Sequence, residues 1–254
     1  MSIDLTKYER DDSAPVAESS RLSAGLVERL GALQLAQLVH RRRSIILFEG
    51  WEGSGKRAAL RCLAGAWDPC AFATHCPATD DQDSHWLARY WSILPGAGQS
   101  ALFHGSWYRR VADERLVGRL TDKAWARRCD EINEFEAQQH DHGTLLAKLF
   151  FNVTESVQAR RILDRDTDPW RRWLAPVRNR QPQPPRDIRV GVWTDLLRAT
   201  DTRWAPWTVI DANDSGAGAD AALTAIADLM HKSIPLNPPS EGDTVVMLNQ
   251  QKAG

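Results

Sequence analysis

The chain has 254 residues, of which 43% are hydrophobic and 26% charged, and its formal net charge at pH 7 is −1. This length is enough to bury a large core in one domain with short extensions, and the near-neutral charge argues against nucleic acid or a membrane surface as a partner. No apolar leader or bilayer-spanning run is evident, and the four cysteines have no metal-type spacing. We therefore expect a cytoplasmic protein with reduced thiols.

Hydrophobic periodicity predicts helices and strands that alternate along the chain. Helices are expected at 22–39, 57–67, 79–91, 122–139, 154–166, 190–198 and 217–232. Strands are expected at 45–48, 71–75, 100–103, 144–153 and 207–211. Such alternation favours an α/β fold with three αβα layers around a mainly parallel sheet. We divide the chain into a loosely ordered segment at 1–20, a domain at 21–234 and a mobile tail at 235–254.

A phosphate-binding loop is predicted between the first strand and the helix at 57–67. Residues 50–56, with the sequence GWEGSGK, fit the Walker A spacing G-x-x-x-x-G-K, although Arg57 stands where Ser or Thr usually follows. Main-chain N–H groups of such a turn form a concave nest for phosphate, and the helix N-terminus adds partial positive charge. We therefore assign phosphate binding to Gly50, Gly53, Ser54, Gly55 and Lys56. A glycine-rich turn with a solvated lysine is the alternative, which the strand and helix around it disfavour.

Five separated segments carry a resemblance to a known family. They are FEGWEGSGK (48–56), LFHGSWYRRV (102–111), EINEFE (131–136), DPWRRW (168–173) and APWTVIDAND (205–214). In this order they resemble the polyphosphate kinase 2 family, and in particular its polyphosphate:AMP phosphotransferase members, over roughly residues 40–230. The resemblance implies a P-loop kinase-like fold with a helical lid at about 155–189.

The resemblance also implies an activity and a set of site residues. Members transfer a phosphoryl group reversibly between inorganic polyphosphate and a nucleotide such as AMP, ADP or GDP, with Mg²⁺ or in its place Mn²⁺. It implies that Glu52 orients the acceptor phosphate and binds the metal, and that Lys56 and Arg110 act with it in catalysis. The basic lid is matched by Arg161, Arg165, Arg171 and Arg172. Because members are often dimers or tetramers, a homo-oligomer is implied.

Two departures from the family pattern bear on activity. His104 replaces the metal-binding aspartate of the family's F-D-R-S-W-Y run, and Gly105 replaces its phosphate-contacting arginine. A neutral imidazole suits softer metals than Mg²⁺, which prefers oxygen ligands. Loss of such preorganised groups typically weakens transition-state stabilisation. We therefore keep two alternatives: a catalytically impaired, polyphosphate- or nucleotide-binding regulatory homologue, and a P-loop small-molecule kinase that uses ATP as donor.

For other arginines and tryptophans, a structural role is at least as well supported as a role in the site. We expect four arginines of the lid region to be solvated charges, namely Arg178, Arg180, Arg186 and Arg189. Four tryptophans are candidates either for stacking on a nucleobase or for core packing, namely Trp51, Trp86, Trp107 and Trp170.

Overall fold

A five-stranded parallel sheet forms the centre of the molecule, which we describe from a computed structural model over residues 3–9, 23–77, 85–174 and 183–239. The strands are β1 (Arg43–Gly50), β2 (Phe72–His75), β3 (Ser100–His104), β4 (Thr144–Asn152) and β5 (Trp207–Asp211). Their order in the sheet is β2-β3-β1-β4-β5, and every pair is parallel. The predicted α/β fold with a parallel sheet is confirmed.

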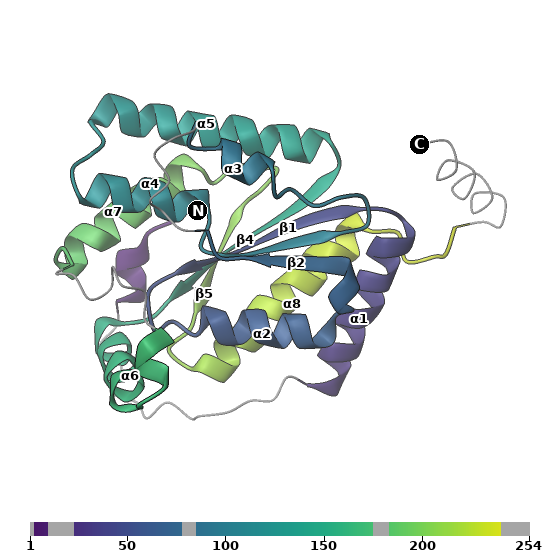
Figure 1. The fold of residues 1–254 in the computed structure, drawn as a ribbon, viewed down its shortest axis with the longest axis horizontal. Coiled ribbons are helices and arrows are strands. Elements are labelled where there is room, and N and C mark those ends of the chain that lie inside the picture. The colour runs from purple at the N-terminus through teal and green to yellow at the C-terminus, as the bar shows by residue number, and fades with distance from the viewer. Residues whose placement is uncertain (1–2, 10–22, 78–84, 175–182, 240–254) are drawn as a thin grey trace.

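Helices cover both faces of this sheet, giving three layers (Figure 1). One layer holds α1 (Ala24–Val39), α2 (Lys56–Ala66) and α8 (Ser215–Ser233). The other holds α3 (Ala88–Trp91), α4 (Trp107–Leu116), α5 (Asp122–Asp141) and α7 (Arg186–Ala199). The helix α6 (Glu155–Thr167) and the short 3₁₀ turn η3 (Arg171–Leu174) follow β4 at one end of the sheet. Within the described ranges, no helix is both long and apolar enough to cross a bilayer.

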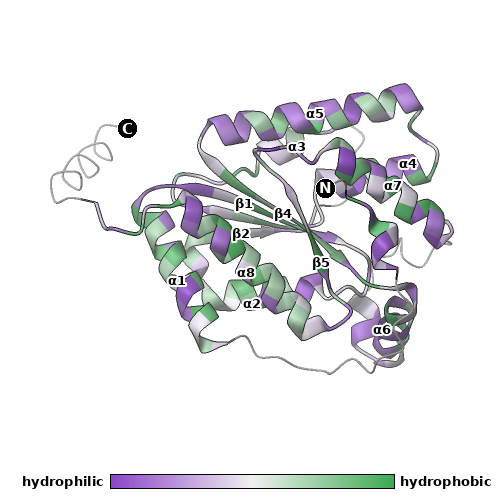
Figure 2. Cartoon of the chain, turned by 180° about the vertical axis from the view of Figure 1, so that it is seen from behind, coloured by the Kyte–Doolittle hydropathy of each residue, from purple (hydrophilic) through white to green (hydrophobic). Residues whose placement is uncertain are grey.

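The hydrophobic core lies along β1 and β4. All nine residues of β4 are buried, as are seven of the eight residues of β1. Figure 2 shows the apolar residues gathered on the strands and on the inward faces of the helices. Strands covered on both faces carry near-continuous apolar runs, which is why these two were readily predicted. The chain leaves β1 toward one side of the sheet and leaves β3 toward the other, so their carboxyl ends form the switch point where such folds bind ligands.

Several predicted boundaries need correction. Within the segment expected to be loosely ordered, residues 3–9 include a 3₁₀ helix, η1 (Leu5–Tyr8), and the Leu5 side chain is fully buried. Leu5 N–H donates to Thr194 Oγ1 of α7 at 3.3 Å, so this stretch is fixed to the domain. In the helix predicted at 79–91, residues 79–84 lie outside the described residues and helix is present only from Ala88. In the turn before this helix, His85 Nδ1 accepts a hydrogen bond from Leu87 N–H at 3.4 Å.

Two further boundaries differ from prediction. The helix α4 was not predicted, and α7 begins at Arg186 rather than at residue 190. Proline fixes φ at a helical value, and Pro185 stands at the start of α7. Of the predicted mobile tail, residues 235–239 are described, and His40 Nε2 donates to Asn237 O at 2.8 Å. Residues 240–254 lie outside the described residues.

A buried charge network fixes α4 against β4 and α5. Glu136 Oε1 accepts from Tyr108 Oη at 2.5 Å and from Trp107 Nε1 at 3.1 Å. Lys148 Nζ donates to Glu136 Oε2 at 2.8 Å, to Tyr108 Oη at 3.1 Å and to Thr200 O at 2.7 Å. Neither charged side chain is exposed to solvent. Burial lowers the pKa of Lys148, and the carboxylate of Glu136 opposes that effect.

We predict that breaking this pair destabilises the fold strongly. Lys148→Met leaves Glu136 as an uncompensated buried charge, which typically costs about 3–5 kcal/mol of unfolding free energy. The double change Glu136→Leu with Lys148→Met is expected to cost less than the sum of the two single changes. Urea unfolding at neutral pH measures all three values.

The matched control is an exposed ion pair of the same chain. Arg29 and Asp228 lie 2.7 Å apart with side chains 38% and 52% exposed, and Arg29→Ala should cost under about 1 kcal/mol. A Lys148→Met variant that loses no more stability than Arg29→Ala would contradict the structural role of the network.

Candidate functional site

The predicted phosphate loop leaves the sheet where β1 pairs with β4. Gly50 lies opposite Phe151 in this ladder, and a Cβ on Gly50 would lie 2.2 Å from Phe151 O. Only glycine fits so close an approach, and its φ of +127° is also one that other residues rarely adopt. Gly53 and Gly55 have φ values of +71° and +84°. The sequence thus forms the compact turn needed to direct main-chain N–H groups toward an anion.

Lys56 begins α2 directly after this turn. Its side chain is buried, and Nζ donates to Gly50 O at 3.0 Å and to Trp51 O at 2.7 Å. The ammonium group therefore lies against the loop that it was predicted to serve. The Ser54 hydroxyl is also buried, and among the described residues it has no hydrogen-bond partner.

A buried carboxylate that the sequence analysis did not single out joins the ends of β1 and β3. Glu49 Oε1 accepts from Ser106 N–H at 2.6 Å and from Ser106 Oγ at 2.8 Å. Glu49 Oε2 has no hydrogen-bond partner among the residues described. Burial raises the pKa of Glu49, against the opposing influence of Arg109, Ser106 and Lys56. A charged residue inside an otherwise apolar strand was the available signal for this residue, because such residues are seldom buried unless paired.

The two divergent residues, His104 and Gly105, lie at the end of β3 beside the loop. Burial, followed by the positive charges of Lys56, Arg57 and Arg109, lowers the pKa of His104 from 6.5 to about 3. The imidazole is therefore neutral at physiological pH. Gly105 has a φ of +78°, and a Cβ there would lie 3.2 Å from Arg109 Cδ. The structure thus places a neutral ring and a glycine where the family pattern has a carboxylate and a guanidinium.

The arginines of α6 bind the phosphate loop in two different ways. Arg161 Nη1 donates to Gly53 O at 3.2 Å and to Ala212 O at 2.9 Å, so this side chain bridges main-chain carbonyls of two loops. Arg165 Nη1 forms an ion pair with Glu52 Oε1, and its Nη2 lies 2.8 Å from Asp166 Oδ1. Gln158 Nε2 donates to Glu52 O at 2.8 Å. The helix α6 therefore contacts the loop directly.

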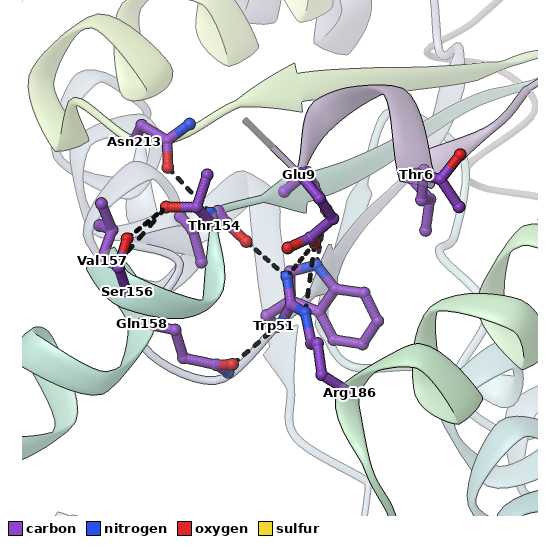
Figure 3. A network of polar contacts seen from close by, with 12 residues as sticks. Thr6, Glu9, Trp51, Thr154, Ser156, Val157, Gln158, Arg186 and Asn213 are labelled. Atoms are coloured by element: carbon purple, nitrogen blue, oxygen red, sulfur yellow. Dashed lines mark hydrogen bonds and ion pairs between the residues drawn. The ribbon is translucent and has the colours of Figure 1, made fainter. Parts of the chain in front are cut away.

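Arg186 is buried, which corrects its interpretation as a solvated charge (Figure 3). Its guanidinium donates to Val153 O at 2.5 Å, to Gln158 Oε1 at 2.9 Å and to Glu9 Oε1 at 2.6 Å. It also lies 4.1 Å from the centroid of the Trp51 ring. Arg186 therefore connects the N-terminal segment, the end of β4 and the loop tryptophan, because its planar fork can serve several acceptors at once.

One cavity of about 690 Å³ brings the loop and the lid together. The loop contributes Gly50, Trp51 and Glu52, and the lid contributes Arg165, Arg172 and Trp173. The helix α4 supplies Arg109 and Asp113, and α7 supplies Arg189 and Trp193. Arg189 therefore lies at this cavity and is not simply a surface charge. Arg178 and Arg180 lie outside the described residues.

Seven predicted site residues do not line the cavity in the part of the chain that the structure describes: Gly53, Ser54, Gly55, Lys56, Arg110, Arg161 and Arg171. Lys56 lies against the loop carbonyls and Arg161 against main-chain oxygens, as above. Arg110 is buried with Nε 3.1 Å from Glu114 Oε1, and Arg171 is exposed. Of the four tryptophans, Trp51 lines the cavity, Trp86 and Trp107 belong to the core, and Trp170 is 85% exposed.

Among the described residues, no cluster of three or more His, Cys, Asp or Glu side chains is arranged to hold a metal. The cavity does present single carboxylates, those of Glu52, Asp113 and Asp166. Mg²⁺ in phosphoryl-transfer sites commonly takes only one or two carboxylates and completes its shell with water and substrate phosphates. The donor set therefore fits a metal that arrives with its substrate and does not fit a resident ion.

Comparison with known proteins supports the resemblance. Residues 16–234 match the family model of polyphosphate kinase 2 (PPK2). A polyphosphate:AMP phosphotransferase from Pseudomonas syringae pv. tomato is 30% identical over 239 residues, which are 92% of this chain and 46% of that protein. A GDP-polyphosphate phosphotransferase from Mycolicibacterium smegmatis is 32% identical over 209 residues, 81% of this chain and 73% of that protein.

Comparison with solved structures also finds polyphosphate kinase 2 proteins. The crystal structure of a polyphosphate kinase 2, described as putative, from Pseudomonas aeruginosa has a TM-score of 0.77 and 28% identity, covering 83% of this chain and 46% of that one. The polyphosphate kinase 2 from Arthrobacter aurescens has a TM-score of 0.79 with 98% of both chains covered, and at 19% identity this likeness shows the fold alone. The chain spans about half the length of the Pseudomonas proteins it matches. From the extent of the family match and these relatives, the chain belongs to the polyphosphate kinase 2 family.

Proposed function

We propose that this protein transfers a phosphoryl group between inorganic polyphosphate and a nucleoside mono- or diphosphate. The observation that carries the proposal is one cavity lined by Gly50, Trp51 and Glu52 at the start of the glycine loop and by Arg165 and Arg172 on another side. Relatives named for transfer to AMP, ADP and GDP support the substrate class. Phosphoryl transfer requires mainly positioning and charge neutralisation, which these groups supply.

Each group has a distinct part in this proposal. Main-chain N–H groups of the turn and the N-terminus of α2 hold phosphate oxygens, with Lys56 beneath them. Guanidinium forks of Arg165 and Arg172 match the geometry of phosphate and can bind it bidentately. Glu52, paired with Arg165 in the structure, orients the acceptor phosphate once that pair opens. Ser54 offers a buried hydroxyl without a partner among the described residues.

A divalent metal completes the proposal. Mg²⁺, or Mn²⁺ in its place, would neutralise charge on the transferred phosphoryl group. Glu52 is the residue that would hold it together with substrate oxygens, and Asp113 and Asp166 are the other carboxylates of the same cavity. No further geometry is assigned to the ion.

The proposal predicts transfer from polyphosphate to AMP, ADP or GDP in the presence of Mg²⁺, measured by nucleotide chromatography. Arg172→Ala removes a cation that lines the cavity and should lower the rate about 10²-fold, as loss of one preorganised electrostatic group typically does. Lys56→Ala should lower it at least as much. The same assay with ATP in place of polyphosphate tests the alternative of an ATP-dependent small-molecule kinase.

Arg171→Ala is the matched control, because Arg171 is adjacent to Arg172 but does not line the cavity. Its rate should stay within about threefold of the parent, as for surface changes away from a site. Folding of each variant is checked by circular dichroism. If the parent yields no more product than a folded Lys56→Ala variant, the proposed activity is wrong.

A second candidate is a binding or regulatory homologue with impaired turnover, which the neutral His104 favours. A ring with a lowered pKa supplies no negative charge where the family pattern has a carboxylate. In this case the cavity would bind polyphosphate or nucleotide without transferring phosphate.

We predict that His104→Asp alone separates the two candidates. In a regulatory homologue, the new carboxylate should create Mg²⁺-dependent transfer where the parent has none. Adding Gly105→Arg is less informative, because the residue has a left-handed φ and any side chain would crowd Arg109. A parent that already turns over at about 1–100 s⁻¹, the usual range for kinases, would exclude the regulatory candidate.

The neutral state of His104 also predicts a pH dependence of stability. Its pKa in the folded protein, about 3, lies below the unfolded value of 6.5, so as the pH falls below 6.5 the unfolded chain takes up the proton first. The unfolding free energy of the parent should therefore fall relative to His104→Asn by up to about 1.4 kcal/mol per pH unit between pH 6 and 4. Urea unfolding of both proteins measures this difference, and a constant difference over that range would contradict a half-buried, neutral imidazole.

A further inference from the structure

Arg109 is a cation of the cavity wall whose buried Nε has no hydrogen-bond partner among the described residues. It lies in the first turn of α4, half-buried, and lines the cavity that also contains Arg165 and Arg172. The neighbouring Arg110, in contrast, pairs with Glu114 at 3.1 Å. Because a buried N–H group without an acceptor is costly, the Nε of Arg109 indicates a missing acceptor, which an anionic ligand in the cavity would supply.

Gly105 provides the room in which Arg109 lies. A Cβ on Gly105 would be 3.2 Å from Arg109 Cδ and 3.9 Å from Nη1. The guanidinium of Arg109 therefore extends over the position from which a side chain at 105 would begin. The family run F-D-R-S-W-Y has an arginine at this position, whereas this chain has glycine there and an arginine four residues later.

The charges nearby leave Arg109 available for a ligand. His104, at the end of β3, is neutral and does not compete for the guanidinium. The positive charge of Arg109 opposes the rise in the pKa of Glu49, and Glu49 Oε1 is already occupied by Ser106 N–H and Oγ. Arg109 therefore lines the cavity as a cation whose buried Nε has no hydrogen-bond partner among the described residues.

We propose that Arg109 binds a phosphate group of the polyphosphate chain, and that its guanidinium, projecting over Gly105, takes the place of the arginine missing at position 105. This inference rests on the proposed function for the class of ligand. It makes Arg109 a phosphate-binding residue contributed by α4, facing the same cavity as the lid residues Arg165 and Arg172. It also explains why the chain combines glycine at 105 with arginine at 109.

The test is the affinity of the full chain for tripolyphosphate, measured by isothermal titration calorimetry at constant ionic strength. Arg109→Ala should weaken binding about 10- to 100-fold, the scale of a lost hydrogen-bonded charge contact. Arg109→Lys keeps the charge but loses the fork, so an intermediate loss is expected. Arg61→Ala, which removes an exposed arginine of α2 outside the cavity, should leave binding unchanged.

A relocation variant tests the exchange of positions directly. Gly105→Arg combined with Arg109→Ala should recover part of the affinity lost in Arg109→Ala, because the guanidinium returns from a neighbouring attachment point. Since a left-handed φ strains any side chain at 105, thermal unfolding is measured for each variant. If another variant does not fold, the tripolyphosphate affinity of Arg109→Lys is used to test the role of Arg109.

The outcomes separate this inference from the proposed function. Parent binding that is lost in Arg172→Ala but unchanged in Arg109→Ala and Arg109→Lys overturns the role of Arg109 alone. A parent that neither binds tripolyphosphate nor transfers phosphate overturns both. Loss of affinity in Arg109→Ala, with Arg61→Ala unchanged, supports the role of Arg109 whether or not the protein turns over.

Discussion

The close pairing of β1 with β4 is the constraint on which the site depends. Because Gly50 has no Cβ, the Phe151 carbonyl approaches it more closely than any side chain permits, and the strand can turn at that point. The loop, Lys56 and the start of α2 follow from this turn. On the other side of β1, the Glu49 carboxylate holds Ser106 and with it the N-terminus of α4. The two contacts fix the ends of three adjacent strands around one cavity, at the place where parallel α/β sheets bind ligands.

Charge is distributed around this cavity in an uneven way. Several buried or half-buried cations of the described structure pair with a carboxylate: Lys148 with Glu136, Arg165 with Glu52 and Arg186 with Glu9. These pairs orient side chains and contribute less to stability than their short distances suggest, because each ion loses its hydration. The Glu52–Arg165 pair differs from the others because both members line the cavity. Under the proposed function, a phosphate that binds Arg165 would compete with Glu52 for the same guanidinium.

The sequence predicted the scaffold better than the site. The apolar runs of β1 and β4 and the periodicity of α5 located the central elements, because strands buried on both faces leave a strong pattern. The helix α4 was missed since its first turn, Trp107 to Arg110, mixes aromatic and basic residues without clear spacing. Motifs identified the loop and the lid, but a motif does not say where a side chain points: Arg161 and Arg110 turned to main-chain oxygens and to Glu114. Arg186 and Glu9 are 177 residues apart, a contact that no local pattern predicts.

The residues at 104 and 105, which differ from the family pattern, change the charge of the site without changing the path of the backbone after β3. Ser106 still accepts Tyr108 N–H as the N-cap of α4 at 3.4 Å and still donates to Glu49, so the connection after β3 keeps its path. What changes is that a neutral ring stands at 104, and that the guanidinium of this region projects from α4 instead of from the loop. Binding of a polyanion depends on the number and reach of cations, whereas transfer also depends on a ligand for the metal. A chain of this kind can therefore keep the first property while weakening the second, and the two must be measured separately to assign its role.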